Sequence, residues 1–216
     1  MCPDPVPRAL PRHFPVPVTG AGVVVPIRAF SLGNARLAEV LDVGERTELA
    51  RSMAERVVRA AGDLPIVVVS SAAEVRAWCA TRGLTVVDDP GSLDAAARAG
   101  VARLAADGCV RAVVAHADLP HVEELGSVAR DGSLPIATLV PCHRDDGTPV
   151  LSIPIDSGFE FQYGDGSFVR HVAEARRVGL AIRVVRDPRL RFDVDTPDDL
   201  AALGDGWLLA RRASAS

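Results

Sequence analysis

Residues 110–120 read V-R-A-V-V-A-H-A-D-L-P, a short and mainly apolar run that ends in a polar turn. Such a run, rich in Val and too short for a packed helix, is typical of a buried strand. Similar runs occupy residues 22–27 and 65–70, and between them Leu49, Met53 and Val57 recur at helical spacing. Alternating buried strands and amphipathic helices predict an α/β fold with three layers, α/β/α, around a mostly parallel mixed sheet.

The same patterns predict the remaining elements and the domain limits. A Pro-rich and poorly ordered arm is expected over residues 1–21, one domain over 22–203, and a tail over 204–216. The segment Arg-Asp-Asp-Gly at 144–147 predicts a hairpin between the strands on either side of it. We expect strands at 22–27, 65–70, 85–88, 110–115, 136–141, 149–154 and 181–186, and helices at 44–61, 72–81, 92–106, 121–130 and 167–178.

Composition excludes several classes of protein. The chain has 216 residues, and its 24 basic and 28 acidic residues give a net charge of −4, so nothing in the overall charge favours nucleic acid as a partner. No apolar run approaches the about 20 residues of a membrane span. The cysteines lack a C-x-x-C pair, which favours free, buried thiols in a cytoplasmic protein; they are Cys2, Cys79, Cys109 and Cys142.

Every basic residue is Arg, because the sequence contains no Lys. Schiff-base chemistry, a lysine general base and a phosphate-binding GxxxxGK loop are therefore excluded. No G-x-S-x-G nucleophile motif occurs either.

Three carboxylates are candidate metal ligands. Asp118 follows the strand at 110–115, and the carboxyl ends of strands border the ligand crevice in open α/β sheets. Asp193 and Asp195 are two residues apart, so in an extended segment both face the same side. Neighbouring carboxylates repel unless a cation joins them, which favours a hard divalent ion. For Asp195, capping of a helix that starts at Pro197 is an equally good interpretation.

Two further segments carry groups that bind anions. Residues 163–168, Y-G-D-G-S-F, place glycines and Ser167 at a helix start, where phosphate binds; a plain Ser N-cap is the alternative. Thr148, after the hairpin glycine, is either a turn residue or an anion ligand. The loop at 28–36 carries Arg28 and Arg36, whose guanidinium groups suit phosphate oxygens, although solvated surface Arg is the alternative.

The histidines show no ligand spacing, and we interpret them as surface or packing residues. They include His116, His121, His143 and His171.

Together these segments resemble the 2-phospho-L-lactate guanylyltransferase family of coenzyme F-420 biosynthesis. The resemblance covers about residues 22–203 and lies in the loop at 25–38, the Asp-Leu-Pro turn at 118–120, Gly147-Thr148, the segment 163–171, and Asp-Val-Asp-Thr-Pro at 193–197. It implies a nucleotide-diphospho-sugar transferase-like fold. It also implies transfer of GMP from GTP to a three-carbon phospho-acid, which is 2-phospho-L-lactate, phosphoenolpyruvate or 3-phosphoglycerate.

The resemblance also implies residue roles. Asp118, Asp193 and Asp195 would hold Mg²⁺ and act as the catalytic residues. The residues expected on the GTP side are Arg28, Asn34, Arg36 and Asp94, and those expected to hold the acceptor's phosphate are Thr148, Gly164 and Ser167.

The sequence departs from the family pattern where Arg28 and Asn34 replace lysines, Asp94 replaces Asn, and Ala117 replaces Gly. Another nucleotide or acceptor, or a silent nucleotide-binding paralogue, is the alternative, and a homodimer is compatible with either.

Overall fold

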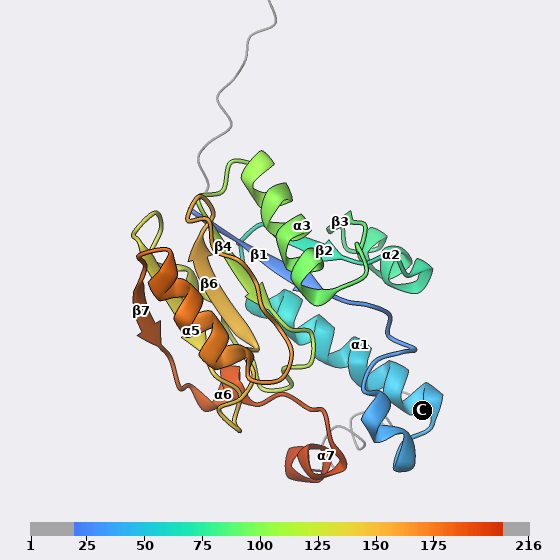
Figure 1. Cartoon of the computed structure of the whole chain (residues 1–216). Helices are drawn as coiled ribbons and strands as arrows, with labels where there is room; N and C mark the ends of the chain where they lie inside the picture. The colour runs from blue at the N-terminus through green and yellow to red at the C-terminus, as the bar shows by residue number, and fades with distance from the viewer. Residues whose placement is uncertain (1–19, 205–216) are drawn as a thin grey trace, which may run out of the picture.

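Seven strands form a single mixed sheet in the order β3-β2-β1-β4-β6-β5-β7. The computed structural model describes residues 20–204. Strands β1 to β4 are parallel, β6 is antiparallel to both β4 and β5, and β7 is parallel to β5. The strands are β1 (Ala21–Pro26), β2 (Ile66–Val69), β3 (Thr85–Val87), β4 (Arg111–Ala115), β5 (Ile136–Val140), β6 (Val150–Pro154) and β7 (Ala181–Val184). The mostly parallel α/β prediction is therefore confirmed (Figure 1).

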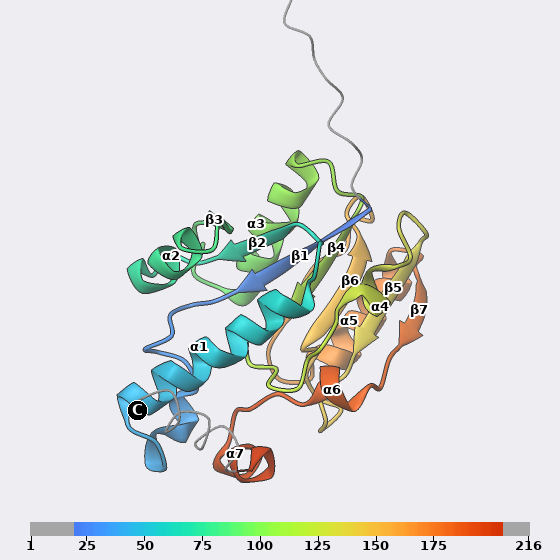
Figure 2. The ribbon, with the colours of Figure 1, turned by 180° about the vertical axis from the view of Figure 1, so that it is seen from behind.

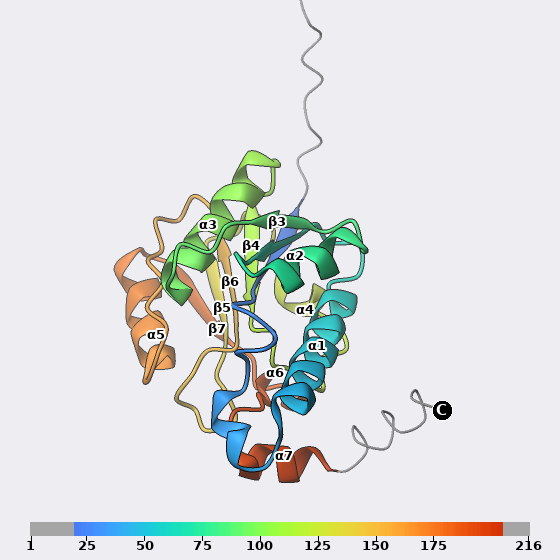
Figure 3. The ribbon, with the colours of Figure 1, turned by 90° about the vertical axis from the view of Figure 1, so that its right-hand side faces the viewer.

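Helices cover both faces of the sheet, because the central strands are apolar on both sides. Val23 and Val25 of β1 pack with α1, α2 and α4, whereas Val24 packs with α3 and α5 on the other face. Figure 3 shows the two groups of helices on opposite sides of the sheet. Figure 2 shows α1 lying across the sheet face that it covers. The helices are α1 (Val43–Ala60), α2 (Ala73–Ala80), α3 (Leu93–Ala106), α4 (Gly126–Ala129), α5 (Ser167–Arg177), α6 (Pro188–Arg191) and α7 (Pro197–Leu203), with a 3₁₀ turn η1 (Ala35–Glu39).

The predicted hairpin is confirmed, but one predicted helix is largely wrong. Strands β5 and β6 pair antiparallel on either side of the turn at 144–147. Of the helix expected over 121–130, only α4 exists. Leu125 is buried, and its backbone N–H donates to the Ala60 carbonyl at the end of α1, 2.8 Å away. This backbone N–H therefore bonds to α1 and not to a carbonyl one helical turn earlier. The short elements η1 and α6 were not predicted.

Several expectations concern the chain ends and the thiols. The Pro-rich arm and the tail lie outside the described residues, apart from residues 20, 21 and 204, and Ala21 already belongs to β1. Cys79, Cys109 and Cys142 are buried, as expected, while Cys2 lies outside the described residues. No helix within residues 20–204 combines the length and the apolar character that crossing a membrane requires.

A third, smaller apolar cluster lies apart from the two faces of the sheet. Leu37 of η1 and Leu49 and Met53 of α1 enclose the side chain of Val194, which is fully buried. This cluster fixes the segment before α7 against the loop that follows β1.

The approach of α3 to β1 generates a stability prediction. A Cβ on Gly100 would lie 2.2 Å from Val24 Cγ1, which is far inside van der Waals contact. Gly100→Ala should therefore lower the free energy of unfolding by about 1–3 kcal/mol through overpacking, despite the better helix propensity of Ala. Urea unfolding measures this, and a variant as stable as the wild type would contradict the described packing. Gly20→Ala, where a Cβ meets nothing within 4 Å and φ is not positive, is the control for the Gly to Ala change and should leave stability nearly unchanged.

Candidate active site

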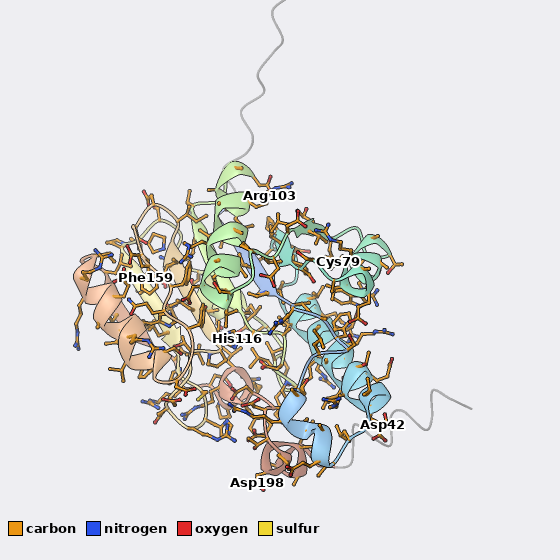
Figure 4. All side chains as sticks on the ribbon, turned by 45° about the vertical axis from the view of Figure 1, so that its right-hand side comes forward. Asp42, Cys79, Arg103, His116, Phe159 and Asp198 are labelled. Carbon is orange, nitrogen blue, oxygen red and sulfur yellow. The ribbon has the colours of Figure 1, made fainter. Side chains whose placement is uncertain are left out.

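A cleft in two halves lies at the carboxyl ends of β1 and β4. One half, about 380 Å³, is lined by the loop after β1, and the other, about 340 Å³, by the β5–β6 hairpin and the loop before α5. Leu93, His116 and Asp195 line both halves and so form their common border. His116 is labelled in Figure 4, below α3 near the middle of the molecule.

The backbone of Val194 joins three loops of the cleft. Its N–H donates to the Asp118 carbonyl at 3.2 Å, and its carbonyl accepts from Asn34 Nδ2 at 2.7 Å. Asn34 has a left-handed backbone (φ 50°), which Asn tolerates better than most residues. In this structure Asn34 is thus a loop anchor that also lines the first half of the cleft.

The three candidate carboxylates lie in both halves of the cleft. Asp118 lines the first half, Asp193 the second, and Asp195 both. Asp118 Oδ1 is buried and has no hydrogen-bond partner within the described residues. Burial, reinforced by the charges of Asp193 and Asp195, raises the pKa of Asp118 to about 7. An ionised Asp118 therefore lacks a compensating cation.

The alternative role of Asp195 as a helix cap is wrong. Thr196 is the N-cap of α7, and Asp199 completes a capping box with it. Asp195 instead forms an ion pair with Arg36. The expected common face is observed, since Asp193 and Asp195 both line the second half of the cleft while Val194 between them is buried in the third cluster. Among residues 20–204, no three His, Cys, Asp or Glu side chains already gather as a metal site, so a cation would have to draw these carboxylates together.

Asp193 contacts His143, which the sequence analysis interprets as a surface or packing residue. His143 Nδ1 lies 3.2 Å from Asp193 Oδ1, and its Nε2 lies 3.1 Å from Asp199 Oδ1. Burial raises the pKa of Asp199, but hydrogen bonds from Arg144 and Thr196 outweigh burial and lower it to about 2. The ionised Asp199 fixes the His143 ring against Asp193. No spacing pattern signals this, because the two segments are distant in the sequence.

The residues expected on the GTP side do not all lie together. Arg28 and Asn34 line the first half, whereas Arg36 lines the second. Asp94 lines neither half: its Oδ1 accepts from the Tyr163 backbone N–H at 2.7 Å. It therefore anchors the loop before α5.

The residues expected to hold the acceptor's phosphate do lie together. Thr148, Gly164 and Ser167 line the second half, and Ser167 Oγ is 3.4 Å from Thr148 Oγ1. Gly164 has φ +102°, a conformation that favours glycine. The N-cap of α5 is Gly166, so the alternative of Ser167 as a plain N-cap is wrong.

Arg170 holds the loop before α5 by hydrogen bonds to its backbone. Its guanidinium donates to the carbonyl oxygens of Gln162 and Tyr163 at distances near 3.1 Å. The loop thus keeps its conformation without a ligand.

His171 sets the direction of the Thr148 hydroxyl. The Gln162 backbone N–H can only donate, and it lies 3.0 Å from His171 Nε2, which must accept. Nδ1 of the neutral ring therefore carries the proton and donates to Thr148 Oγ1, 3.0 Å away. Burial, with smaller effects of His116 and Arg170, lowers the pKa of His171 to about 4, so the ring is neutral at pH 7. The Thr148 hydroxyl proton is left to donate to a ligand.

An acidic cleft at the carboxyl ends of the strands lies where open α/β sheets bind their ligands. Solved structures agree on this fold. A putative nucleotide-diphospho-sugar transferase from Desulfovibrio desulfuricans matches with a TM-score of 0.71 at 17% identity, over 91% of this chain and 96% of that one. The structure of CMP:2-keto-3-deoxy-manno-octonic acid synthetase complexed with CTP matches with a TM-score of 0.56 at 17% identity, over 90% of this chain and 100% of that one.

Sequence comparison then gives the family. The model of the family described as "Guanylyl transferase CofC like" matches residues 21–204, and the chain belongs to this family. Phosphoenolpyruvate guanylyltransferases from Roseiflexus castenholzii and Rubrobacter xylanophilus are 32% and 34% identical, over 83% of this chain and 86% and 91% of theirs. The 2-phospho-L-lactate guanylyltransferase of Methanothermobacter thermautotrophicus is 24% identical over 83% of this chain and 82% of its own. The protein is therefore a guanylyltransferase, and its family implies coenzyme F-420 biosynthesis.

The buried His171 generates a pH prediction. Its folded pKa of about 4 lies below the ordinary 6.5, so the unfolded chain binds the proton more readily. Stability from this group is present above pH 6.5 and is lost as the pH falls toward 4, by about 2 kcal/mol between pH 7.5 and 5. Urea unfolding at both pH values should show a loss about 2 kcal/mol larger in the wild type than in His171→Gln, because the other titrating groups are the same in both proteins. An equal loss in both proteins would contradict a neutral, buried His171.

Proposed function

We propose that the protein transfers GMP from GTP to phosphoenolpyruvate with Mg²⁺ as cofactor, releasing pyrophosphate. The observation that carries the proposal is the two-part cleft with Asp195 on its common border, Asp118 in the first half and Asp193 in the second. Such a cleft can hold two anionic substrates whose reacting atoms meet beside the carboxylates. Phosphoenolpyruvate is favoured because the relatives with that name are up to 34% identical, against 24% for the one named for 2-phospho-L-lactate.

The nucleotide is assigned to the first half of the cleft. Arg28 reaches this half from the loop after β1 and would bind triphosphate oxygens through its guanidinium. Because the chain contains no Lys, Arg must supply the positive charge that the triphosphate needs.

The acceptor is assigned to the second half. Thr148, oriented by His171, would donate its hydroxyl proton to the acceptor's phosphate, with Ser167 and the Gly164 loop beside it. An oxygen of that phosphate attacks the α-phosphorus of GTP, the new P–O bond forms, and the bond from the α-phosphorus to the bridging oxygen breaks. Pyrophosphate leaves with that electron pair. No side-chain nucleophile is required, so positioning and charge stabilisation supply the catalysis.

The three carboxylates fit a divalent cation. Asp118 has a buried, unpartnered oxygen, and Asp193 and Asp195 add negative charge to it. Mg²⁺ held by these three residues would neutralise phosphate oxygens and stabilise the charge that develops in the transition state. The Asp193 carboxylate is kept in position by His143, and Asp195 by Arg36. A cytoplasmic location and a homodimer stay predictions.

Pyrophosphate release tests the reaction directly. The purified protein should release pyrophosphate with Mg²⁺, GTP and phosphoenolpyruvate, and far more slowly with ATP, CTP or UTP. Release with 2-phospho-L-lactate or 3-phosphoglycerate alone would keep the reaction class but contradict the acceptor. A folded protein that is silent with all nucleotides and acceptors would contradict the proposal.

Asp118→Asn separates metal binding from folding. Because the pKa of Asp118 is raised, the folded protein binds the Asp118 proton more tightly than the unfolded chain does. The stability that this proton gives to the folded protein is lost as the pH rises from about 4 to 7. At pH 8 the variant should therefore be about 1–3 kcal/mol more stable than the wild type without metal. Pyrophosphate release should fall by orders of magnitude, and Mg²⁺ with GTP should no longer raise the unfolding temperature. A variant that is less stable without metal, or that turns over normally, would contradict the assignment.

A further inference from the structure

The loop after β1, which lines the first half of the cleft, is attached to a helix that does not line the cleft. Every residue from 26 to 34 except Ser31 lines this half. Ser31 is bonded instead to α2, and no residue of α2 lines either half within the described chain. One wall of the half assigned to the nucleotide is therefore held by a helix outside the cleft.

Glu74 of α2 makes this attachment through two hydrogen bonds. The backbone N–H and the hydroxyl of Ser31 both donate to Glu74 Oε1, each at 2.9 Å. Hydrogen bonds to a charged acceptor are stronger than those between neutral groups. The bond from the Ser31 backbone is the main cause that holds the pKa of Glu74 below its ordinary value, against the opposing effect of burial. The Glu74 side chain is therefore a carboxylate at neutral pH.

Phe30 supplies a second attachment to the same helix. Its buried ring meets Trp78 edge to face with the centroids 5.4 Å apart, and the Arg51 guanidinium carbon lies 5.7 Å from its centroid. Glu74 and Trp78 are four residues apart, so they lie on the same side of α2. The contacts of Phe30 alone would let the loop turn about its ring. The two bonds from Ser31 remove this freedom, because they fix the next residue in a defined direction.

Arg28 is the side chain whose position depends on this attachment. It lines the nucleotide half, and within residues 20–204 its guanidinium makes no hydrogen bond or ion pair. Its backbone carbonyl accepts from Ser70 Oγ at 3.5 Å, which is a long hydrogen bond. Apart from that bond and those to Glu74, no hydrogen bond in the described chain joins residues 28–32 to another element. The direction of the Arg28 side chain is therefore set mainly by how the loop is held.

We propose that Glu74 is a positioning residue for the nucleotide: its bonds to Ser31 hold the loop so that Arg28 meets the triphosphate. This inference rests on the proposed function and deepens it. An ordered loop has already lost the backbone freedom that the nucleotide would otherwise have to remove. Without Glu74, nucleotide affinity falls by the fraction of molecules whose loop is correctly placed, while the acceptor half is unaffected.

Calorimetry of GTP with Mg²⁺ and the full chain tests the proposal without turnover. Glu74→Ala should raise the Kd for GTP by about 10-fold. In the pyrophosphate assay the KM for GTP should rise by a similar factor, while kcat and the KM for phosphoenolpyruvate stay within about 2-fold, because bound GTP holds the loop in place. Glu74→Gln keeps an oxygen that accepts both bonds and should stay within about 3-fold of the wild type. Ser31→Ala loses only the hydroxyl bond; it should raise the Kd by about 3-fold and tests the same contact if Glu74→Ala does not fold.

Glu55→Ala is the matched control on the same helix. The Glu55 carboxylate also bonds to α2, accepting from Trp78 Nε1 at 3.3 Å and from Arg82 Nε at 2.8 Å, but within the described chain it has no bond to the loop. This variant should leave the Kd for GTP within about 2-fold of the wild type. Arg28→Ala removes the group that is positioned, so adding Glu74→Ala to it should raise the Kd by only about 2-fold or less.

Three results would overturn the inference. Glu74→Ala could bind GTP like the wild type, its KM for phosphoenolpyruvate could rise as much as its KM for GTP, or its effect could be as large in the Arg28→Ala background as in the wild type. In each case a wild-type enzyme that binds GTP and releases pyrophosphate leaves the proposed function standing. A wild type that binds no nucleotide removes both.

Discussion

The two hydrogen bonds of the Val194 backbone are the constraint on which the cleft depends. One reaches the turn after β4 and the other reaches Asn34 in the loop after β1, while the Val194 side chain is buried between η1 and α1. The neighbouring residues, Asp193 and Asp195, both line the second half of the cleft. A single extended segment thus brings two carboxylates to Asp118 and fixes the border between the two halves of the cleft.

The cleft is held in a conformation that is unfavourable without ligands. Asp118, His116 and Tyr163 each bury a polar atom with no partner in the described part of the chain. Arg170 and Asp94 fix one loop, and the Asp199 network fixes another. The free protein is less stable because of these unpaired atoms, but the site is already arranged before a ligand binds. Such a trade-off between stability and activity is common in enzyme clefts.

The sequence predicted the sheet well because its signal is local. Short Val-rich runs mark strands buried on both faces, and the hairpin follows from its turn. The stretch 121–125 was predicted as a helix, since the bond from Leu125 to the end of α1 has no local signature. The individual contacts of the site were less predictable for the same reason. Arg36 crosses to the acceptor half through its pair with Asp195, and the tautomer of His171 depends on a backbone N–H that only the folded loop supplies.

The most direct test of the account is a structure with Mg²⁺, phosphoenolpyruvate and a GTP analogue whose α- and β-phosphorus atoms are joined by a methylene group. The account predicts the triphosphate in the half lined by Arg28 and the acceptor's phosphate against Thr148 and Ser167. The α-phosphorus and the attacking oxygen should meet at the border formed by His116 and Asp195. A triphosphate bound against Thr148, or an acceptor outside the second half, would contradict it.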